Sequence, residues 1–335
     1  MNQHRVLFAI LAVLLLVGGP ASSADAPPGG GFSLPVDCLP GRDCWIMNYP
    51  DMDPGTGVAD PACGARSYDG HQGTDFAVRD IQAMRRGVAV LAAAEGTVRR
   101  VRDGVADRLI RSAADMKAVA GRDCGNGVVV DHGKGWETQY CHMRRGSLAV
   151  RAGDIVQRGQ VLGQIGLSGR TEFPHVHLTI RQDGIVRDPL SGRIQTSGCG
   201  AERKSLWSEA RPYRPASLYA AGFAAGPVTG LGVKQDAASP ERLTVATPAL
   251  VFWTAAFGVR KGDRLTLTIV GPGGRNLLER QIALPRNQAW RMNFAGKKRG
   301  QGRWPSGLYR GEAVLQRGAG ADALILRREV SITIE

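Results

Sequence analysis

The chain has 335 residues, of which 43% are hydrophobic and 22% are charged, so its composition excludes both a disordered protein and a bundle of membrane helices. This length allows two domains with hydrophobic cores, and 45 glycines beside only 6% aromatic residues favour short strands and turns over packed helices. The formal net charge of +13 is unevenly spread, because residues 225–335 hold 17 Lys and Arg against 8 Asp and Glu, which leaves +9 there.

Residues 1–24 are typical of a secretory signal peptide. Arg5 precedes an apolar run from Val6 to Val17, and small residues lead to a cleavage site after Ala24. A membrane anchor is the alternative, but the run is shorter than the roughly 20 residues that span a bilayer. We therefore expect a bacterial protein that is periplasmic or secreted, with the signal peptide cleaved and no transmembrane anchor left.

Six cysteines follow the expected cleavage site. An even number in an exported chain favours disulfides, and the absence of any C-x-x-C spacing disfavours a cysteine-rich zinc site. Several pairings are open. One consistent set is Cys38–Cys44 within "CLPGRDC", Cys124–Cys141 across an expected hairpin, and the remaining Cys63–Cys199.

Residues 25–190 divide into an arm and a strand-rich domain. Residues 25–66 are rich in Cys, Gly and Pro and predict an irregular N-terminal arm. Residues 67–190 predict short strands separated by glycine turns, including a hairpin at "HGKGW". Residues 104–123 interrupt this pattern as an insertion. Its weak helical spacing involves Leu109, Met116 and Val119.

The rest of the chain predicts a connection and a second β domain. Residues 191–240 are rich in Pro, Ala and Gly and are expected to be a linker. Residues 241–335 contain several evenly spaced strand patterns, which predict a small β-sandwich of the immunoglobulin-like kind. This segment has neither His nor Cys, so we expect no catalytic group in it. The predicted fold class is mainly β.

Four histidines and one aspartate lie in three segments of residues 67–190. His175 and His177 in "FPHVHLTI" would share one face of a strand, because side chains alternate with period two. His71 and Asp75 lie in "GHQGTDFAV", and His142 closes "TQYCH". Imidazole and carboxylate are the usual ligands of a catalytic zinc, which takes three protein groups and leaves a position for water. Two further histidines beside such a site could move protons.

These segments resemble the M23 (LytM, lysostaphin-like) zinc metallopeptidases of the peptidoglycan DD-endopeptidase type. "HQGTDFA" is similar to their H-x-G-x-D-x-A segment, "YCHM" to Y-x-H-L, and the glycine-spaced stretch that ends in "PHVH" to P-H-L-H. The resemblance covers residues 67–190 and implies a mostly antiparallel sheet with the site in a groove. It also implies that His71, Asp75 and His177 hold Zn²⁺ and that His142 and His175 are the catalytic pair.

The resemblance implies a zinc endopeptidase that hydrolyses peptide bonds in peptidoglycan cross-links or stems, by attack of a zinc-bound water assisted by two histidines. One alternative is a non-enzymatic LytM-like regulator that activates another cell-wall hydrolase, although such regulators have typically lost metal ligands and none is lost here. Another is a secreted protease of protein substrates. Val176 and Met143 stand where the family has Leu, and the insertion and arm leave the scissile bond open.

Other features point to no further cofactor. His132 lies beside the expected hairpin turn and is expected to be structural, and Trp136 and Tyr140 to be packing or groove residues. No G-x-x-x-x-G-K-[ST] occurs, so a nucleotide site is unsupported. The basic last third predicts binding to acidic wall or envelope polymers, with a merely solvated surface as the alternative. Export argues against a nucleic-acid partner.

Overall fold

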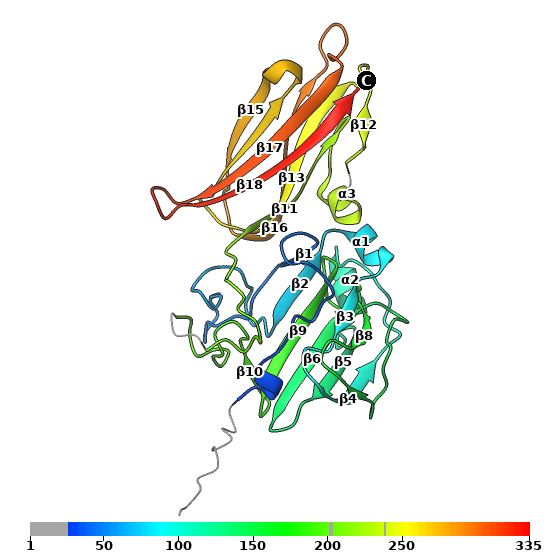
Figure 1. The fold of residues 1–335 in the computed structure, drawn as a ribbon, viewed down its shortest axis with the longest axis vertical. Helices are drawn as coiled ribbons and strands as arrows, with labels where there is room; N and C mark the ends of the chain where they lie inside the picture. Colours follow the sequence, from blue (N-terminus) through cyan, green and yellow to red (C-terminus); the bar gives the residue numbers. More distant parts are fainter. Residues whose placement is uncertain (1–25, 201–203, 238) are drawn as a thin grey trace, which may run out of the picture.

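The structure is a computed structural model that describes residues 26–200, 204–237 and 239–335 (Figure 1). Antiparallel sheets dominate it, which confirms the mainly β fold class. The expected signal peptide lies outside the described residues. Within those residues, no helix has the length and apolar character needed to cross a membrane.

The first half of the chain is built around an eight-stranded antiparallel sheet. Its strands follow the order β1-β2-β9-β6-β5-β4-β7, and β10 pairs with β9. A two-stranded sheet of β3 and β8 packs nearby, with two short helices and a 3-10 turn (Figure 1). The elements are η1 (Pro28–Gly30), β1 (Cys44–Ile46), β2 (Thr74–Val78), α1 (Ile81–Arg86), β3 (Ala89–Leu91), β4 (Gly96–Arg102), α2 (Ala113–Ala118), β5 (Asn126–Asp131), β6 (Trp136–Met143), β7 (Ile155–Val156), β8 (Val161–Gln164), β9 (His175–Gln182) and β10 (Ile185–Arg187).

The alternation along β9 gives this sheet two different faces. Val176, Leu178 and Ile180 point into the hydrophobic core, while His175 and His177 lie on the opposite face, as period two requires. The register of β2 and β9 then places Asp75 directly opposite His177. The central strands therefore bury an apolar layer on one side and bring polar groups together on the other.

The insertion at 104–123 differs from the expected helix. Helix α2 begins only after Ser112, whose hydroxyl accepts a bond from the Asp115 amide at 3.2 Å. Leu109 lies ahead of the helix, because the neighbouring amides donate elsewhere: Arg108 N to Leu167 O at 3.0 Å, and Ile110 N to Thr171 O at 2.9 Å. The insertion thus forms an outer layer along the segment that precedes β9.

The last third is two sheets packed face to face. One sheet has the order β11-β13-β16, and the other β12-β18-β17-β14-β15, in which only the short β12 runs parallel to its neighbour. Phe223 and Phe252 of the first sheet meet Leu267, Leu315 and Ile332 of the second in one core. The elements are β11 (Ser217–Ala224), α3 (Gly230–Gln235), β12 (Arg242–Leu243), β13 (Ala249–Val259), β14 (Arg264–Val270), η2 (Pro272–Gly274), β15 (Asn276–Ala283), β16 (Gln288–Lys298), β17 (Gly307–Arg317) and β18 (Leu324–Ile334).

Part of the segment expected as a linker belongs to this sandwich. Residues 191–240 contain β11 and α3, and β11 pairs with β13 along almost its whole length. Leu218 and Phe223 of β11 enter the sandwich core, which explains why an Ala- and Gly-rich stretch forms a strand. The expectation overlooked that a few large residues suffice when small ones line the rest of a buried strand.

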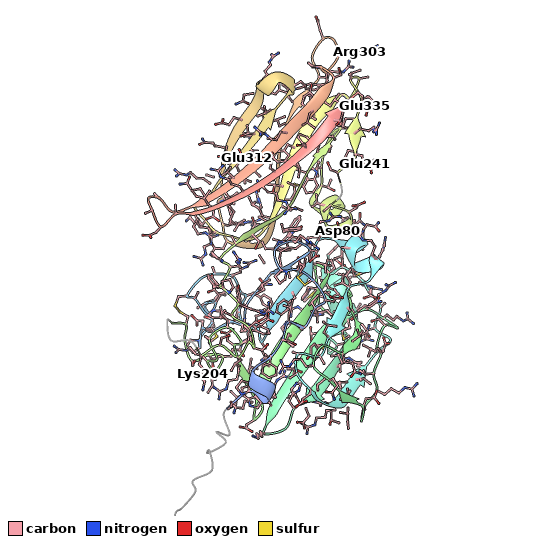
Figure 2. The ribbon with its side chains drawn as sticks, viewed as in Figure 1. Asp80, Lys204, Glu241, Arg303, Glu312 and Glu335 are labelled. Carbon is pink, nitrogen blue, oxygen red and sulfur yellow. A yellow bond between two sulfur atoms is a disulfide. The ribbon has the colours of Figure 1, made fainter. Side chains whose placement is uncertain are left out.

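The two halves are joined by buried polar contacts as well as by apolar packing. Arg66 is almost fully buried, and its guanidinium donates to the carbonyls of Ile46 and Met47 at the edge of the first sheet and to that of Arg214 next to β11. Asp80, at the junction in Figure 2, caps α1 through the Ala83 amide at 2.6 Å and accepts a second bond from the Ala237 amide at 3.0 Å. The sandwich is therefore seated directly on the first half.

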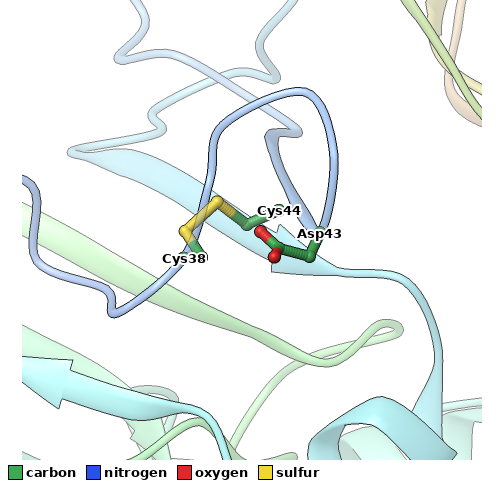
Figure 3. A group of neighbouring side chains, drawn as sticks. All are labelled: Cys38, Asp43 and Cys44. Carbon is green, nitrogen blue, oxygen red and sulfur yellow. A yellow bond between two sulfur atoms is a disulfide. The ribbon is translucent and has the colours of Figure 1, made fainter.

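Three disulfides join all six cysteines, and the described residues contain no free cysteine. They are the set expected from spacing: Cys38–Cys44, Cys63–Cys199 and Cys124–Cys141. Figure 3 shows the first of them beside Asp43. Because both sulfur atoms are consumed in the bond, this group offers no thiolate to a metal.

Candidate active site

Three side chains converge on one point above the central strands. His71 Nε2 lies 3.1 Å from Asp75 Oδ1 and 3.1 Å from His177 Nδ1, and the latter two atoms are 2.8 Å apart. Within the described parts of the chain, this is the one His-Asp-His group compact enough to hold a metal ion. Asp75 comes from β2, His177 from the facing position on β9, and His71 from the turn just before β2.

The remaining polar atoms of these side chains are held from outside the group. His71 Nδ1 donates to Tyr49 O at 2.7 Å, and His177 Nε2 donates to Thr179 Oγ1 at 3.0 Å. Asp75 Oδ2 accepts a bond from Asn48 Nδ2 at 2.8 Å. Such outer partners fix the tautomer and orientation of metal ligands in proteins.

This arrangement fits a divalent cation. With the outer nitrogens protonated, the inner atoms of His71 and His177 are lone pairs that face each other and a carboxylate oxygen with no proton between them. Ligands about 2.0–2.2 Å from a tetrahedral Zn²⁺ are roughly 3.3 Å apart, close to the separations found here. Nitrogen and oxygen donors in a set of three are those of a catalytic zinc site.

The charges of the His71, Asp75 and His177 group also suit a divalent cation. Burial alone would raise the pKa of Asp75, but the neighbouring His71 and His175 hold it well below its usual range. Burial lowers the pKa of His177, which favours the neutral imidazole. The set therefore presents one negative carboxylate and, at His177, a neutral imidazole.

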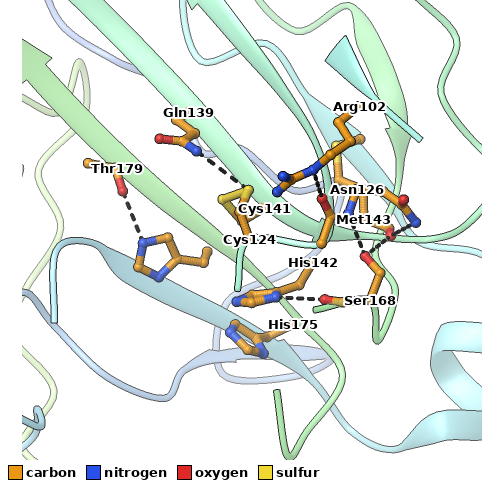
Figure 4. The surroundings of a disulfide bond; sticks show 12 residues. Arg102, Cys124, Asn126, Gln139, Cys141, His142, Met143, Ser168, His175 and Thr179 are labelled. Atoms are coloured by element: carbon orange, nitrogen blue, oxygen red, sulfur yellow. Dashed lines mark hydrogen bonds between the residues drawn. A yellow bond between two sulfur atoms is a disulfide. The ribbon is translucent and has the colours of Figure 1, made fainter. Parts of the chain in front are cut away.

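His142 and His175 lie beside this group with their rings 4.6 Å apart (Figure 4). His142 Nδ1 donates to Ser168 O at 2.8 Å, and His175 Nδ1 donates to Phe173 O at 2.8 Å. In both rings Nε2 is left toward the site, and that of His175 is 3.4 Å from Asp75 Oδ1. The structure thus brings all five predicted site residues together.

The two rings differ in their tendency to hold a proton. Burial, together with His175 and His177, keeps the pKa of His142 well below its usual value, so its Nε2 is a free lone pair near neutral pH. Burial also lowers the pKa of His175, but the charge of Asp75 and bonds to Asp75 and Phe173 outweigh this and raise it overall. Near neutral pH, His142 is therefore the unprotonated ring, and His175 is the ring that holds a proton more readily.

A β-bulge aims His142 at the site. In a regular strand His142 would follow Tyr140 into the core, but Asn126 pairs with Met143 and Val128 with Tyr140, so two residues of β6 oppose one of β5. His142 takes a left-handed conformation with φ of 61°. The opposing residue is Gly127, where a Cβ would come within 2.3 Å of Tyr140 O.

The Cys124–Cys141 disulfide stabilises this bulge (Figure 4). It ties the residue before His142 to the loop ahead of β5, and the His142 amide donates to Cys124 O at 2.8 Å. A non-glycine residue at positive φ persists only where its surroundings hold it. The disulfide and this amide bond provide that restraint at His142.

Several residues of the site were not found from the sequence. Thr179 lies two positions after His177 on the same strand face, so strand periodicity could have indicated it. Asn48 and Tyr49 come from the arm, and nothing in their local pattern links them to His71 or Asp75. Tyr68 packs its ring 4.4 Å from that of His71 and remains half exposed.

His132 stands apart from the site, as expected. Its Nε2 contacts Thr138 Oγ1 at 2.8 Å, its Nδ1 contacts Glu95 O, and its ring packs edge-on against Phe32. Trp136 and Tyr140 are buried in the core of the first half. The arm, which could have offered a further metal ligand, instead contributes Asn48 to the carboxylate of Asp75.

Comparisons with known proteins agree on one family. The model of peptidase family M23 matches residues 69–189. An uncharacterized metalloprotease of Haemophilus influenzae is 28% identical over 139 residues, which are 41% of this chain and 24% of that protein. The peptidoglycan DD-endopeptidase ShyA of Vibrio cholerae is 32% identical over 124 residues, or 37% of this chain and 23% of that protein.

The family model matches residues in the first half of the chain, and this chain spans about a quarter of the length of these curated relatives. A crystal structure of a zinc-containing peptidase from Vibrio cholerae overlaps 47% of this chain and 39% of its own at 24% identity, with a TM-score of 0.32, too low to support an argument. The family match, the two relatives and the converging His-Asp-His group point the same way. Residues 69–189 of this chain are a domain of peptidase family M23.

Proposed function

We propose that the protein is an exported zinc endopeptidase that hydrolyses peptide bonds in peptidoglycan cross-links or stems. The observation that carries this proposal is the set of three inward-facing donors of His71, Asp75 and His177 beside the rings of His142 and His175, whose Nδ1 atoms are bonded to backbone carbonyls and whose Nε2 atoms face the site. A regulator without activity would need none of these groups. The name of the ShyA relative supports peptidoglycan as the substrate class.

The residues divide the chemistry among them. His71 Nε2, Asp75 Oδ1 and His177 Nδ1 would hold the metal, and Zn²⁺ supplies a Lewis acid that polarises the scissile carbonyl and lowers the pKa of water. His142, neutral and oriented by Ser168 O, accepts the proton of the attacking water at Nε2 and returns it to the leaving amine. His175, whose Nδ1–H is held by Phe173 O, takes up a second proton at Nε2 more readily and then donates it to the oxygen that gains negative charge.

Release of muropeptides tests this proposal. The zinc-loaded mature protein is incubated with purified peptidoglycan, and the products are separated and identified by mass. We expect fragments from one cleaved peptide bond, which would also name the bond. Intact peptidoglycan, together with stimulation of a second wall hydrolase, would instead identify a regulator. Cleavage of proteins but not of the wall would identify a secreted protease.

Export is supported by the disulfides. All six cysteines are paired, as is usual in oxidising compartments and rare in the bacterial cytosol. Fractionation of the producing cells checks it. We expect the protein in the periplasm or medium, shortened by the proposed signal peptide of residues 1–24, and an unshortened cytosolic protein would contradict export.

The sandwich carries a cationic pocket that suits an acidic wall or envelope polymer. Its cavity of about 180 Å³ is lined by Arg275, Lys297, Arg299 and Arg303, and Arg303 lies at the end of the sandwich away from the junction (Figure 2). None of these four cations forms an ion pair with another described residue. Four like charges around one cavity favour a multiply charged anion such as a phosphate-bearing polymer.

The floor of this pocket is structural. Trp304 donates its indole N–H to Thr247 O at 2.8 Å, and Tyr309 donates its hydroxyl to Pro305 O at 2.7 Å. Their polar atoms are therefore committed within the sandwich, and recognition falls to the cations. We propose that this pocket holds the protein on the wall while the distant histidine site cleaves it.

A further inference from the structure

The residues just before strand β9 pack against the sandwich. Phe173 is 2% exposed, and its ring packs edge-on against Phe257 at 5.3 Å and Tyr219 at 5.9 Å, with Trp290 at 6.5 Å. These three aromatic residues come from β13, β11 and β16, so all belong to the sandwich. Phe173 belongs to the first half of the chain, residues 26–200, which we call the peptidase half. Its side chain lies in an aromatic socket formed by Tyr219, Phe257 and Trp290 of the sandwich.

The socket is a preorganised unit. Tyr219 and Phe257 stack with their centroids 4.2 Å apart and an interplanar angle of 18°. Trp290 donates its indole N–H to the Tyr219 hydroxyl at 2.7 Å, which fixes the third wall. Rings held in this way leave Phe173 few alternative positions.

A second contact holds the neighbouring carbonyl. Lys234 of α3 donates its ammonium to Glu172 O at 3.1 Å and lies 4.9 Å above the Trp290 ring. The sandwich therefore contacts two consecutive residues of the segment, one through an aromatic ring and one through the backbone.

The same segment orients a proposed catalytic histidine. His175 Nδ1 donates to Phe173 O at 2.8 Å, and the Thr171 hydroxyl donates to that carbonyl at 2.7 Å. A carbonyl accepts only, so it holds the proton of His175 on Nδ1 and leaves Nε2 toward Asp75 and the substrate position. Any movement of Phe173 would displace the acceptor that sets this tautomer.

We propose that the sandwich is a structural part of the active site, in which Tyr219, Phe257 and Trp290 hold Phe173 so that its carbonyl keeps His175 in the Nδ1–H form. Phe173 and Trp290 are positioning residues, because they act through His175 and touch no reacting atom. This inference rests on the proposed function for its effect on rate, but the tautomer of His175 can be measured without substrate.

The experiment uses the zinc-loaded full chain with ¹⁵N-labelled histidine. Long-range ¹H–¹⁵N spectra report which ring nitrogen of each histidine is protonated, and loss of signals in His175→Gln assigns the residue. In spectra recorded at a pH at which His175 is neutral, we expect a single Nδ1–H tautomer in the wild type, and a mixture in Phe173→Ala and in Trp290→Ala. Trp290 is only partly buried, so Trp290→Ala disturbs the core less than Phe173→Ala does. It therefore provides the test if Phe173→Ala does not fold.

Kinetics on a soluble cross-linked muropeptide give the second readout. Trp290→Ala should lower kcat about tenfold, a fraction of the factor expected for losing an acid–base group, with KM and zinc content near those of the wild type. Trp290→Phe, which keeps a ring in the socket, should recover most of the rate. Phe252→Leu, in the sandwich core but away from the socket, is the matched control and should retain the wild-type kcat.

The outcomes separate this proposal from the proposed function. An unchanged Nδ1–H tautomer in both Phe173→Ala and Trp290→Ala overturns the positioning role even if the enzyme cleaves the wall. If Phe252→Leu loses as much kcat as Trp290→Ala does, the positioning role of the socket is also overturned. A wild type that cleaves no wall peptide defeats the proposed function, while a mixed tautomer in the two variants still supports the coupling.

Discussion

The peptidase half and the sandwich are both built from antiparallel strands, but they use the faces of their sheets differently. Among the described residues, 23 polar or charged residues are buried, of which 19 precede residue 200 and 4 lie in the sandwich. The sandwich buries two apolar sheet faces against each other. The peptidase half buries one apolar face and fills the other with histidines, carboxylates and their partners.

The difference shows where stability is given up for chemistry. Burying a polar group costs free energy unless it is well bonded, and burying a charge costs more. The peptidase half contains all three disulfides, whereas the sandwich contains no cysteine. Covalent restraint is thus concentrated where packing is least able to hold the chain, and the sandwich adds a rigid aromatic socket.

The largest expected effect is on metal binding. His177→Ala removes the Nδ1 donor from a set of three, so we expect stoichiometric zinc in the wild type to fall to almost none. Elemental analysis after dialysis measures this. His132→Ala is the matched control, because that histidine is bonded to Glu95 and Thr138 away from the site, and it should keep its zinc. Stoichiometric zinc in His177→Ala would refute the ligand assignment.

The next largest expected effect is the loss of stability when a disulfide of the peptidase half is removed. The Cys63–Cys199 bond links positions 136 residues apart, whereas Cys38–Cys44 links positions 6 apart. Because a longer loop loses more entropy on closure, Cys63→Ser with Cys199→Ser should lower the free energy of unfolding by about 2–5 kcal/mol. Urea unfolding followed by fluorescence measures it. The Cys38→Ser, Cys44→Ser pair should cost less, and the reverse order would contradict this account.

Two buried aspartates make a sharper comparison through pH. Asp263 in the sandwich is paired with Arg317 at 2.8 Å, whereas Asp188 in the peptidase half accepts bonds from Ser191 and from the Leu190 backbone, and one of its carboxylate oxygens has no partner. Burial raises the pKa of Asp188 to about 6. The folded protein therefore binds this proton more tightly than the unfolded chain does.

This difference in proton binding sets the direction in which the free energy of unfolding changes with pH. The contribution of Asp188 is fully present below about pH 4, the unfolded value, and is lost as pH rises through about 6, a change of about 3 kcal/mol at most. In Asp188→Asn this part of the pH dependence of unfolding should disappear, whereas Ser331→Ala, an exposed change in β18, should leave it intact. An identical pH profile in wild type and Asp188→Asn would show that Asp188 does not titrate in this range.

The smallest expected effect concerns the cationic pocket of the sandwich. Exposed charges contribute about 0.2–1 kcal/mol each, so Lys297→Ser with Arg299→Ser and Arg303→Ser should weaken cosedimentation with sacculi by roughly tenfold. Binding by the wild type should also weaken as salt rises. Activity on soluble muropeptides should be unchanged. If the triple variant cosediments with sacculi as strongly as the wild type, the pocket does not bind the wall and the basic surface is merely solvated.

Much of this comparison could be predicted from the sequence, because it depends on local periodicity. The alternation in "HVHLTI" gives both faces of β9, and the absence of histidine and cysteine after residue 240 predicts a sandwich without catalytic groups. The three disulfides match the one set that local spacing and the expected hairpin suggested among several open pairings. These features need only the pattern of neighbouring residues.

What escaped prediction depends on contacts between distant segments. The positive φ of His142 arises from a bulge opposite Gly127, which a strand pattern does not reveal. Asn48 reaches Asp75 only because β1 pairs with β2, and Phe173 reaches Tyr219 only because the sandwich is seated on the peptidase half. β11 was missed because its burial comes from β13, which lies further along the chain.

Paired measurement of zinc content and muropeptide release in His142→Ala tests the central claim most directly. His142 is outside the proposed ligand set and acts through Nε2, so zinc should stay at the wild-type level while the rate falls by about 10²–10⁴-fold. Retained zinc with retained activity would show that His142 is only structural. Lost zinc would show that the division between metal ligands and proton-transfer groups is wrong.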